Sequence, residues 1–492
     1  MKIPYIFASC LVVLPLGANG HKKNKPNEKP NILFICIDDL RRDLGCYGAN
    51  VKSPNLDQLA SEGSLFFNHY VQVPTSGASR ASMLTGRLPR TNGDLNNSAC
   101  ESRITRRKDK TGPESLFHHL RNNGYYTVGI GKVSHSADGY IYGYTSPKSN
   151  RREMPESWDE LLYDYGKWNS GWDAFFGYSN GTNRQGQKYQ VKPYECAPCD
   201  DEGLQDGLTA RIAVDKLKTL AKSEEPFCMV VGFYKPHLPF NSPKKYWDLY
   251  DEKEIGISPM PEIPENIYPN ISLHSSGEFC GYRLGEEKPS LQNRVSDEYA
   301  KKVRHAYYAC ISYTDAQVGK VLQALKESGK MENTIIVVWG DHGWHLGDFR
   351  VWGKHTLYES ALNSTFMMKV PGGKKGVKNT RIVSSVDIYP TLMDLCGVEA
   401  PEGLDGKSFK KLLTNPKDKK WEEAAYSSFG AGTSVRVPGY RLTRYRHKGK
   451  WLDVLFKYKN RRYETENIAE KYPKIVKQLL PIWEKGNLIQ RK

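Results

Sequence analysis

Long hydrophobic runs are scarce in this chain of 492 residues. Beyond residue 16, no segment is long and apolar enough to span a membrane, which excludes a stable membrane span in the rest of the chain. Internal repeats and extended low-complexity tracts are also absent. The sequence is therefore not that of a solenoid or a repeat array.

Cysteine is not abundant enough to suggest a disulfide framework, since the whole chain has ten. Cys36, Cys228 and Cys310 lie in apolar stretches, where we expect them to be buried as small hydrophobic residues. Cys196 and Cys199 form a single C-x-x-C pair, and no second pair at metal-binding spacing accompanies it. This argues against a zinc site and leaves a local disulfide or free thiols.

Acidic residues are outnumbered by basic ones, which gives a formal net charge of +16. A hydrophobic content of 39% is typical of a folded protein, and the length predicts a large domain with a smaller one. A basic surface favours anionic partners such as nucleic acid or a sulfated or carboxylated polysaccharide. No helix-turn-helix, zinc-finger or aromatic RNA-platform pattern is present, so we expect no nucleic-acid partner.

The N-terminus has the pattern of a signal peptide over residues 1–20. Lys2 precedes an apolar stretch at 3–16, and residues 18–20 are compatible with cleavage. Residues 21–30 are polar and are expected to form a flexible tether. We expect export to the periplasm or secretion, and lipoprotein anchoring through Cys10 is the weaker alternative, because the apolar run before it is very short.

Strand-like runs alternate with helical ones through residue 400, which predicts βαβ units and an α/β fold with a mostly parallel sheet flanked by helices. Each predicted helix ends at a glycine, as a C-cap would. The predicted strands cover 31–40, 125–131, 226–233, 334–343 and 364–371, and the predicted helices cover 53–63, 114–124 and 304–329.

Two long stretches, 140–205 and 250–300, show little periodicity. Irregular insertions of this kind in an α/β enzyme usually build the substrate pocket. After Pro401, short β-like runs precede a final helix at about 472–485. We therefore predict a catalytic domain over 31–400 and a smaller C-terminal α+β domain, an antiparallel sheet with one helix, over 401–492.

Two of the predicted strands end in acidic residues. Asp38 and Asp39 finish the first, and Asp341 and His342 finish the run near residue 340. Parallel strands would bring these ends together, and adjacent carboxylates repel each other unless a cation neutralises them. The oxygen-rich set suits Ca²⁺ or Mg²⁺, with roughly 6–8 oxygens favouring Ca²⁺, whereas zinc usually recruits more His or Cys. The alternative is that these residues cap helices or lie in surface turns.

The segment SGASRASMLTGR, residues 76–87, carries the most specific pattern in the chain. It resembles the sulfatase signature: Cys or Ser, any residue, Pro or Ala, Ser, Arg, three variable residues, then Leu-Thr-Gly-Arg. The resemblance implies an alkaline-phosphatase-like fold and a formylglycine-dependent (type I) sulfatase. In that family the first residue, here Ser76, is oxidised to an aldehyde, and the hydrated aldehyde is the nucleophile.

Serine rather than cysteine at position 76 implies an anaerobic-type, radical formylglycine maturase as a partner, and hence a bacterial source. Unmodified serine is a weak nucleophile unless a base or a metal activates it. At a helix N-terminus, Ser76 would stand beside backbone N–H groups that favour an anionic substrate.

The resemblance is closest to the iduronate-2-sulfatase branch and covers most of residues 31–375. It includes DDLRRDLGCYG and SPNLDQLASEG, then GKVSH, YKPHLPF and VWGKH further along the chain. The implied substrate class is 2-O-sulfated uronic acid in heparan or chondroitin type chains, with an algal glycan such as ulvan or carrageenan as the alternative. Phosphodiester or phosphonate hydrolysis on the same fold, and polyanion binding without catalysis, are the rival functions.

Roles follow from the resemblance and from charge. One Ca²⁺ per chain would be held by the four strand-end residues and by Ser76. The sulfate oxygens would be neutralised by Arg80, Lys132 and Lys354.

Two histidines in the matching segments are assigned to proton transfer. His237 would protonate the leaving oxygen, and His135 would act as the base at the hydrated aldehyde. Basic residues near the motifs would read a second anionic group, such as a uronate carboxylate, because an arginine fork can pair with a carboxylate bidentately. These residues are Arg350 and His355, beside Lys354, together with Arg41 and Arg42.

Overall fold

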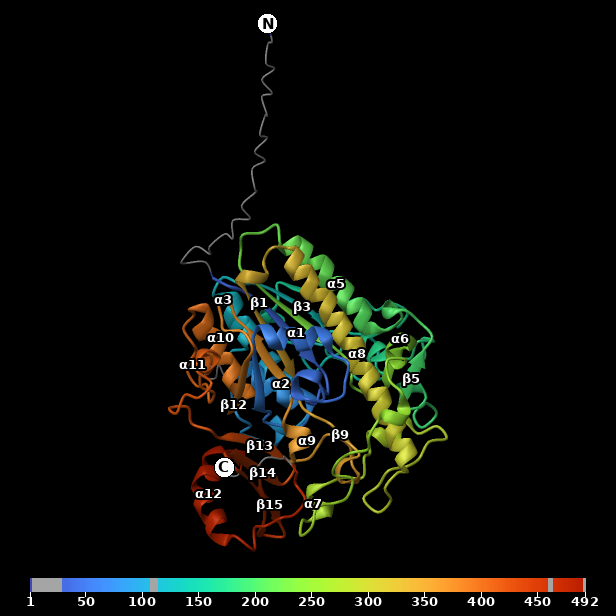
Figure 1. The fold of residues 1–492 in the computed structure, drawn as a ribbon, viewed down its shortest axis with the longest axis vertical. Coiled ribbons are helices and arrows are strands. Elements are labelled where there is room, and N and C mark those ends of the chain that lie inside the picture. Colours follow the sequence, from blue (N-terminus) through green and yellow to red (C-terminus); the bar gives the residue numbers. More distant parts are fainter. Residues whose placement is uncertain (2–28, 107–113, 459–462, 490–492) are drawn as a thin grey trace.

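The computed structural model describes residue 1 and residues 29–106, 114–458 and 463–489 (Figure 1). The predicted signal peptide, with Cys10, and most of the predicted tether lie outside the described residues. Among the helices of the described part, none is both long and apolar enough to cross a membrane.

An eight-stranded sheet forms the centre of the larger body, in the order β12–β2–β11–β8–β1–β6–β3–β4. Its neighbouring strands pair in parallel except at β11, which runs antiparallel to both β8 and β2. The predicted mostly parallel sheet is confirmed. The strands are β1 (Asn31–Ile37), β2 (Ser64–Tyr70), β3 (Tyr126–Gly131), β4 (Glu160–Leu162), β6 (Phe227–Phe233), β8 (Thr334–Gly340), β11 (Phe366–Lys369) and β12 (Val377–Ser384).

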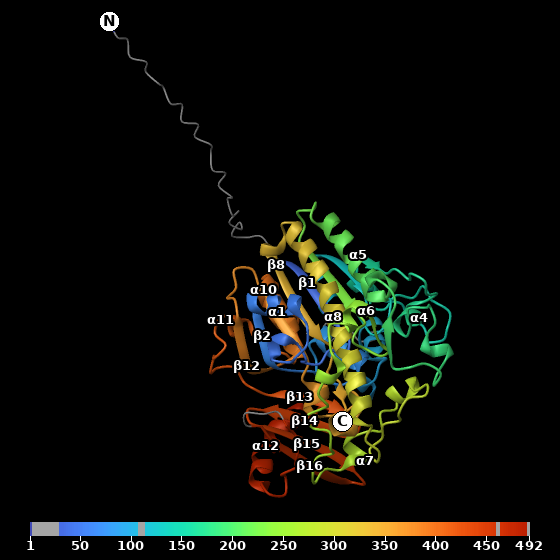
Figure 2. The same ribbon diagram turned by 45° about the vertical axis from the view of Figure 1, so that its right-hand side comes forward.

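Helices cover both faces of this sheet, so its central strand is buried on both sides. Leu33 and Ile35 of β1 belong to one apolar cluster, and Ile32 and Phe34 belong to the other. This explains why the strand reads as a continuous apolar run. Figures 1 and 2 show the two helical layers. One contains α1 (Pro54–Glu62), α5 (Gln205–Leu220) and α8 (Asp297–Glu327), and the other α2 (Ser76–Thr85), α3 (Leu116–Asn122), α10 (Ile388–Cys396) and α11 (Lys410–Thr414).

The predicted helices correspond to α1, α3 and α8, with two differences in detail. Helix α8 begins at Asp297 rather than at residue 304, because the Ser296 side chain caps it by accepting from the Tyr299 N–H. Gly63 follows α1 with an extended φ of −139°, not a left-handed one. Its missing side chain is needed for close packing, since a Cβ there would lie 2.5 Å from the carbonyl oxygen of Met368.

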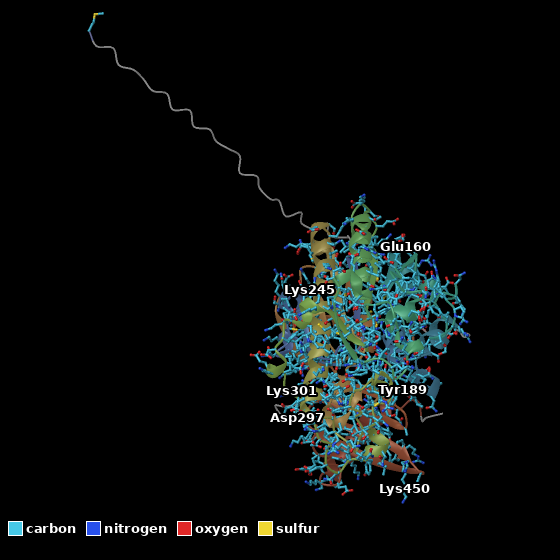
Figure 3. All side chains as sticks on the ribbon, turned by 90° about the vertical axis from the view of Figure 1, so that its right-hand side faces the viewer. Glu160, Tyr189, Lys245, Asp297, Lys301 and Lys450 are labelled. Atoms are coloured by element: carbon cyan, nitrogen blue, oxygen red, sulfur yellow. The ribbon has the colours of Figure 1, made fainter. Side chains whose placement is uncertain are left out.

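The C-terminal part forms a four-stranded antiparallel sheet with one long helix, as predicted (Figure 1). Before it, α11 packs into the apolar cluster of the large sheet. Figure 3 places Glu160 of β4 far from Lys450, the first residue of β16 (Lys450–Lys457), along the length of the molecule. The small unit contains β13 (Ala425–Phe429), β14 (Gly432–Val437), β15 (Tyr440–His447), β16 (Lys450–Lys457) and α12 (Pro473–Gly486).

The irregular stretches 140–205 and 250–300 contain only short elements until α5 and α8 begin at their ends. The C-x-x-C pair lies in the first stretch. Cys196 and Cys199 are free thiols, as are the other cysteines of the described part. The short elements between the large ones are α4 (Gly171–Phe175), β5 (Tyr194–Ala197), β7 (Phe240–Pro243), α6 (Lys244–Trp247), α7 (Pro269–Ser272), β9 (His345–Leu346), β10 (Trp352–Gly353) and α9 (Glu359–Leu362).

His69 of β2 is a buried histidine that couples stability to pH. Its Nδ1 lies 3.1 Å from the Ser364 hydroxyl and its Nε2 lies 3.0 Å from that of Ser385. Burial lowers the pKa of His69 to about 3, whereas an unfolded histidine titrates near pH ~6.5. Between these values the unfolded state binds more protons than the folded state, so stability falls as the pH is lowered.

We expect His69 to lower the free energy of unfolding by about 1.4 kcal/mol for each unit by which the pH falls below ~6. The measurement is urea unfolding between pH 6.5 and 4.5, where His69→Asn should show a shallower pH dependence than the unchanged protein. His447→Asn, at an exposed position on β15, is the matched control for the same substitution made away from the core. An unchanged slope in His69→Asn would contradict the assignment.

Candidate active site

The carboxyl ends of four central strands and the start of α2 meet at one edge of the large sheet. Asp38 follows β1, Asp341 follows β8 and Lys132 follows β3, and the loop after β6 carries His237. Because β1 pairs in parallel with β8 on one side and with β6 on the other, these ends are adjacent. This is the edge at which open α/β sheets bind their ligands.

The carboxylates predicted from the two strand ends are fully buried and converge. Candidate ligand atoms of Asp39, Asp341 and His342 lie within 4.8 Å of one another, as do those of Asp38, Asp39 and His237. The Asp39 N–H donates to Asp341 Oδ1 at 2.9 Å, and Asp39 takes a left-handed φ of 59°. Several buried carboxylate oxygens with one or two imidazoles fit a hard divalent cation.

Arg80 holds two of these carboxylates in position. It follows Ser76 by four residues on α2, so both side chains leave the same face of the helix. Its Nη2 lies 3.1 Å from Asp38 Oδ1, and its Nε lies 3.1 Å from Asp341 Oδ2. Its Nη1 donates to the carbonyl oxygen of Lys132 at 2.8 Å. The guanidinium therefore fixes the relative placement of the two strand ends.

Two buried lysines complete the charge balance of the cluster. Lys132 Nζ lies 2.6 Å from Asp38 Oδ2, and Lys354 Nζ lies 3.0 Å from Asp39 Oδ1. Burial lowers the pKa of Lys132 even beside its carboxylate, whereas Asp39 and Glu278 outweigh burial and raise the pKa of Lys354. Together with Arg80, these two lysines balance the charges of Asp38, Asp39 and Asp341. The added charge of a divalent cation would then be balanced by that of an anionic substrate.

Ser76 is the first residue of α2 and is only 3% exposed. Its Oγ lies 3.0 Å from Nε2 of His342. The Nδ1 of that histidine lies 3.0 Å from the carbonyl oxygen of Gly343, which assigns the proton to Nδ1 and leaves the Nε2 lone pair facing Ser76. A Cβ on Gly77 would lie 2.2 Å from the Asn97 carbonyl oxygen, so only glycine allows the helix to start this close to that loop.

His237 follows β6 and contacts an acidic residue that the sequence pattern did not single out. Its Nε2 lies 3.2 Å from Glu278 Oε1 and 3.7 Å from Asp39 Oδ2. Burial and Lys354 lower the pKa of His237, and Glu278 acts in the opposite direction. Glu278 belongs to the stretch 250–300, which was predicted to build the pocket, but a lone glutamate there follows no periodic pattern.

His135 lies beside a group of aromatic rings from the other irregular stretch. Its Nε2 is 3.4 Å from the hydroxyl of Tyr144, and burial lowers its pKa well below the usual value. The imidazole is therefore neutral and able to accept a proton. Tyr144 is 43% exposed, and its ring centroid lies 4.5 Å from that of Trp172 and 5.6 Å from that of Phe176. The ring of Phe176 in turn lies 6.5 Å from that of His237. We call the rings of Tyr144, Trp172 and Phe176 the aromatic shelf.

The arginines predicted to read a second anionic group are engaged elsewhere. Arg350 donates to Glu262 Oε2 at 2.9 Å, and Arg41 donates to Asp348 Oδ2 at 2.8 Å. The guanidinium of Arg42 lies 4.7 Å from the centre of an aromatic ring. The structure brings none of these three guanidinium groups to the carboxylate cluster.

His355 lies closer, at the wall of a cavity of about 410 Å³ beside the cluster. Its ring stacks on Phe429 of the C-terminal sheet at 5.3 Å, and burial lowers its pKa to about 3, so it is neutral. His274 and Glu278 line the same cavity. The cavity therefore has room for part of a ligand and is bounded by both the large body and the small sheet.

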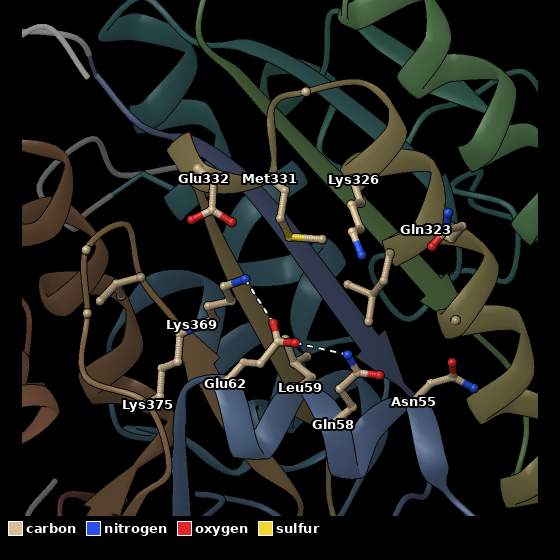
Figure 4. A pocket seen from close by; sticks show the side chains of 16 residues that line it. Asn55, Gln58, Leu59, Glu62, Gln323, Lys326, Met331, Glu332, Lys369 and Lys375 are labelled. Atoms are coloured by element: carbon tan, nitrogen blue, oxygen red, sulfur yellow. Dashed lines mark hydrogen bonds and ion pairs between the residues drawn. The ribbon is translucent and has the colours of Figure 1, made fainter. Parts of the chain in front are cut away.

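A second hollow, of about 470 Å³, lies at the opposite edge of the sheet (Figure 4). There Glu62 pairs with Lys369 at 3.0 Å and accepts a hydrogen bond from Gln58. Its lining residues include no fully buried carboxylate. Of these two regions, only the carboxyl edge of the sheet has a cluster of buried carboxylates that could bind a metal.

Comparisons with known proteins identify the family and the fold. A family profile described as Sulfatase matches residues 30–398, and one described as N-sulphoglucosamine sulphohydrolase, C-terminal, matches residues 347–481. A sulfatase of Formosa agariphila is 29% identical over 466 residues, covering 90% of this chain and 85% of that protein. Iduronate 2-sulfatase of Mus musculus is 31% identical over 439 residues, covering 82% and 74%. The phosphonate monoester hydrolase of Agrobacterium radiobacter shares the fold, with a TM-score of 0.72 at 21% identity, covering 93% and 96%.

Proposed function

Because the chain belongs to the sulfatase family, we propose that this sulfuric ester hydrolase, whose relatives include sulfatases of glycans, removes sulfate from 2-O-sulfated uronic acid. The proposal includes a formylglycine nucleophile made from Ser76 and one bound Ca²⁺. The observation that carries it is the position of Ser76 at the start of a helix, 3.0 Å from His342 and beside three buried carboxylates. The iduronate 2-sulfatase relative supports the sugar class.

The metal would be held by Asp38, Asp39, Asp341 and His342, with residue 76 completing the protein ligands. The buried donor set fits this ion, because it is rich in carboxylate oxygen and contains no thiolate. A divalent cation in this position would lower the pKa of a coordinated hydroxyl and stabilise negative charge on sulfate oxygens.

The cationic side chains of the cluster would bind the sulfate group. Lys132 and Lys354 each have N–H donors beyond those that contact Asp38 and Asp39, and these would pair with sulfate oxygens as charge redistributes. Arg80, already bonded to two carboxylates, would mainly keep the cluster in place. The start of α2 adds backbone N–H groups that favour an anion.

Two histidines would transfer protons, each at a different oxygen. His237 would protonate the leaving alcohol oxygen, and Glu278 at 3.2 Å supports its charged form. His135, neutral through burial, would accept a proton at residue 76. The aromatic shelf would pack against the sugar, and the cavity lined by His355 would take the remainder of the glycan.

If His237 protonates the leaving oxygen, His237→Ala should lower kcat on a sulfated disaccharide by roughly 10²–10⁴-fold. The loss should be much smaller with an aryl sulfate, because a phenolate leaving group needs little protonation. Sulfate release measured on both substrates tests this, with His447→Ala at an exposed position as the control. Equal losses on both substrates would mean that His237 only positions the sulfate.

The substrate class is tested by sulfate release from a panel. The panel contains a 2-O-sulfated uronate disaccharide, a 6-O-sulfated glucosamine disaccharide, ulvan and carrageenan oligosaccharides, and a phosphonate monoester. The proposal expects the highest kcat/KM on the uronate. A clear preference for an algal glycan or for the phosphonate would replace it. No turnover on any of them by protein with modified residue 76 would favour a polyanion-binding role.

Maturation and export belong to the same proposal. Ser76 would require an anaerobic-type maturase, and residues 1–20 would direct the chain to the periplasm or out of the cell. Mass spectrometry of the native protein gives both the state of residue 76 and the mature N-terminus. A retained N-terminus in the cytoplasmic fraction would contradict export.

A further inference from the structure

A uronate carries a second negative charge, and the site described so far holds no group assigned to it. The 2-sulfate and the 5-carboxylate stand on opposite sides of the sugar ring. A cation that binds the carboxylate must therefore lie about one sugar ring away from Ser76. We call this outer part of the site its mouth. Arg41, Arg42 and Arg350 do not lie there, and His355 is neutral.

Arg184 is a cation at the mouth that the preceding assignments do not use. It belongs to the irregular stretch 140–205 and is half-buried. Its guanidinium carbon lies 4.9 Å from the ring centre of Phe176 and 4.7 Å from that of Tyr282. Phe176 is the ring of the aromatic shelf that also contacts His237, so Arg184 is one aromatic ring away from the proposed general acid.

Tyr144 connects Phe176, on which Arg184 stacks, to His135. The hydroxyl of Tyr144 points inward to His135, although the ring is exposed. Burial raises the pKa of Tyr144 and Glu278 raises it further, whereas Lys354, a hydrogen bond with Asn97 and, least of these, Arg184 lower it. The charge of Arg184 therefore acts at the point where the aromatic shelf meets the catalytic groups.

The guanidinium of Arg184 has hydrogen-bonding capacity that the described part of the chain leaves unused. Its Nε is buried and has no hydrogen-bond partner there, and Nη1 donates only to the neighbouring Gln185 side chain, at 3.3 Å. Among the described residues no carboxylate forms an ion pair with it; Glu278, which is near, pairs instead with His237 and Lys354. The Tyr282 hydroxyl also lies close enough to Arg184 to interact with it, but it is neutral. A stacked arginine that no carboxylate occupies is suited to bidentate binding of a planar carboxylate.

We propose that Arg184 is the specificity-determining residue that binds the carboxylate of the sulfated uronic acid, with the sugar ring lying on the aromatic shelf between Arg184 and Ser76. This rests on the proposed function and assigns its second anionic contact. The alternative role is packing alone, in which Arg184 only covers Phe176 and Tyr282. The two roles differ in what a neutral substitution does to different substrates.

The experiment compares Arg184→Gln, Arg184→Lys and the unchanged enzyme on three substrates. These are a 2-O-sulfated uronate disaccharide, its carboxyl-reduced counterpart and an aryl sulfate. Arg184→Gln should lose about 10- to 100-fold in kcat/KM on the uronate, the range expected for one charged hydrogen-bonded contact. It should stay within about threefold of the unchanged enzyme on the other two. Arg184→Lys should recover part of the loss, because it keeps the charge without the fork.

Arg283→Gln is the matched control. Arg283 also stacks on a tyrosine, at 5.3 Å from the ring of Tyr189 (labelled in Figure 3), and its Nε also lacks a hydrogen-bond partner among the described residues. Its tyrosine does not belong to the aromatic shelf. Arg283→Gln should therefore leave all three rates nearly unchanged, and the Tm of each variant shows whether its fold is retained.

Equal losses of Arg184→Gln on all three substrates, or no loss on the uronate, would overturn the assignment and leave the proposed function standing. If the enzyme without substitutions cleaves the uronate and its carboxyl-reduced form equally well, the assignment of Arg184 is overturned too. An unchanged enzyme that cleaves the aryl sulfate but neither disaccharide would instead remove the proposed uronate substrate, and the carboxylate assignment with it. The three failures are thus distinguishable.

Discussion

Replacing Ser76 with alanine is expected to abolish sulfate release while the fold and the carboxylate cluster persist. Ser76 contributes one hydroxyl at 3.0 Å from His342, and losing such a contact costs about 1 kcal/mol of stability. Catalysis depends on it far more, because no other hydroxyl in the proposed mechanism can become the nucleophile. We expect a Tm within a few degrees of the unchanged protein and turnover at the level of the uncatalysed reaction.

The control is Ser82→Ala, a buried serine on the same helix whose hydroxyl is 3.5 Å from Arg103 rather than at the cluster. It should retain activity. Expression without a maturase that accepts serine should give protein as inert as Ser76→Ala, with residue 76 unmodified by mass spectrometry. A fully active preparation whose residue 76 is unmodified serine would contradict the nucleophile proposal.

The sequence predicted the parts of the molecule in which a periodic pattern coincides with a physical constraint. β1 and β8 are apolar on both faces because helices cover both sides of the sheet, so their place in the chain could be read directly, although each strand ends three residues before its predicted run. The residues after those ends converge because parallel neighbours terminate at one edge. The acidic residues at the two strand ends could therefore be predicted to meet. Asp39 and Asp341, which are in contact, are 302 positions apart in the sequence.

The direction of β11 could not be predicted in the same way. A short apolar strand has the same pattern whichever way it runs, and its antiparallel pairing with β8 and β2 depends on the connections around it. The loop after β9 shows a related limit. Arg350 adopts a left-handed φ of 63°, and its guanidinium pairs with Glu262 rather than with the neighbourhood of Lys354.

The residues that line the mouth of the site could not be predicted from the sequence pattern. Glu278, Arg184 and Tyr144 come from stretches without periodicity, and each reaches the site only through the path of its loop. Such positions carry no local signature, because glutamate, arginine and tyrosine are all common on surfaces. The general expectation that insertions form the pocket could be made in advance, but the choice of side chains required the fold.

The second large effect is expected from the carboxylates that would hold the metal. Asp341 accepts from Arg80 Nε at 3.1 Å and from the Asp39 N–H at 2.9 Å. Asp341→Ala would remove a ligand and leave both donors buried without a partner, which combines a loss of metal with a loss of stability. Asp341→Asn keeps the shape of the side chain and one acceptor oxygen, for either the Asp39 N–H or Arg80 Nε, and removes the charge. It therefore costs less stability than Asp341→Ala while still weakening the metal site.

We expect metal content and turnover to fall together in Asp341→Asn and Asp38→Ala, by more than about 100-fold in turnover, since even outer partners of metal ligands cost 10–100-fold. Metal content by mass spectrometry and sulfate release are measured on the same samples, and Ca²⁺ rather than Zn²⁺ should restore activity to chelator-treated enzyme. Asp315→Asn is the control: this buried carboxylate accepts from the N–H groups of Asn55 and Leu56 at the start of α1 and belongs to neither candidate metal group. It should lower stability and leave the metal in place. Full activity of a metal-free Asp341→Asn protein would remove the cation from the proposal, because the buried cations of Arg80, Lys132 and Lys354 would then suffice to bind and activate the sulfate.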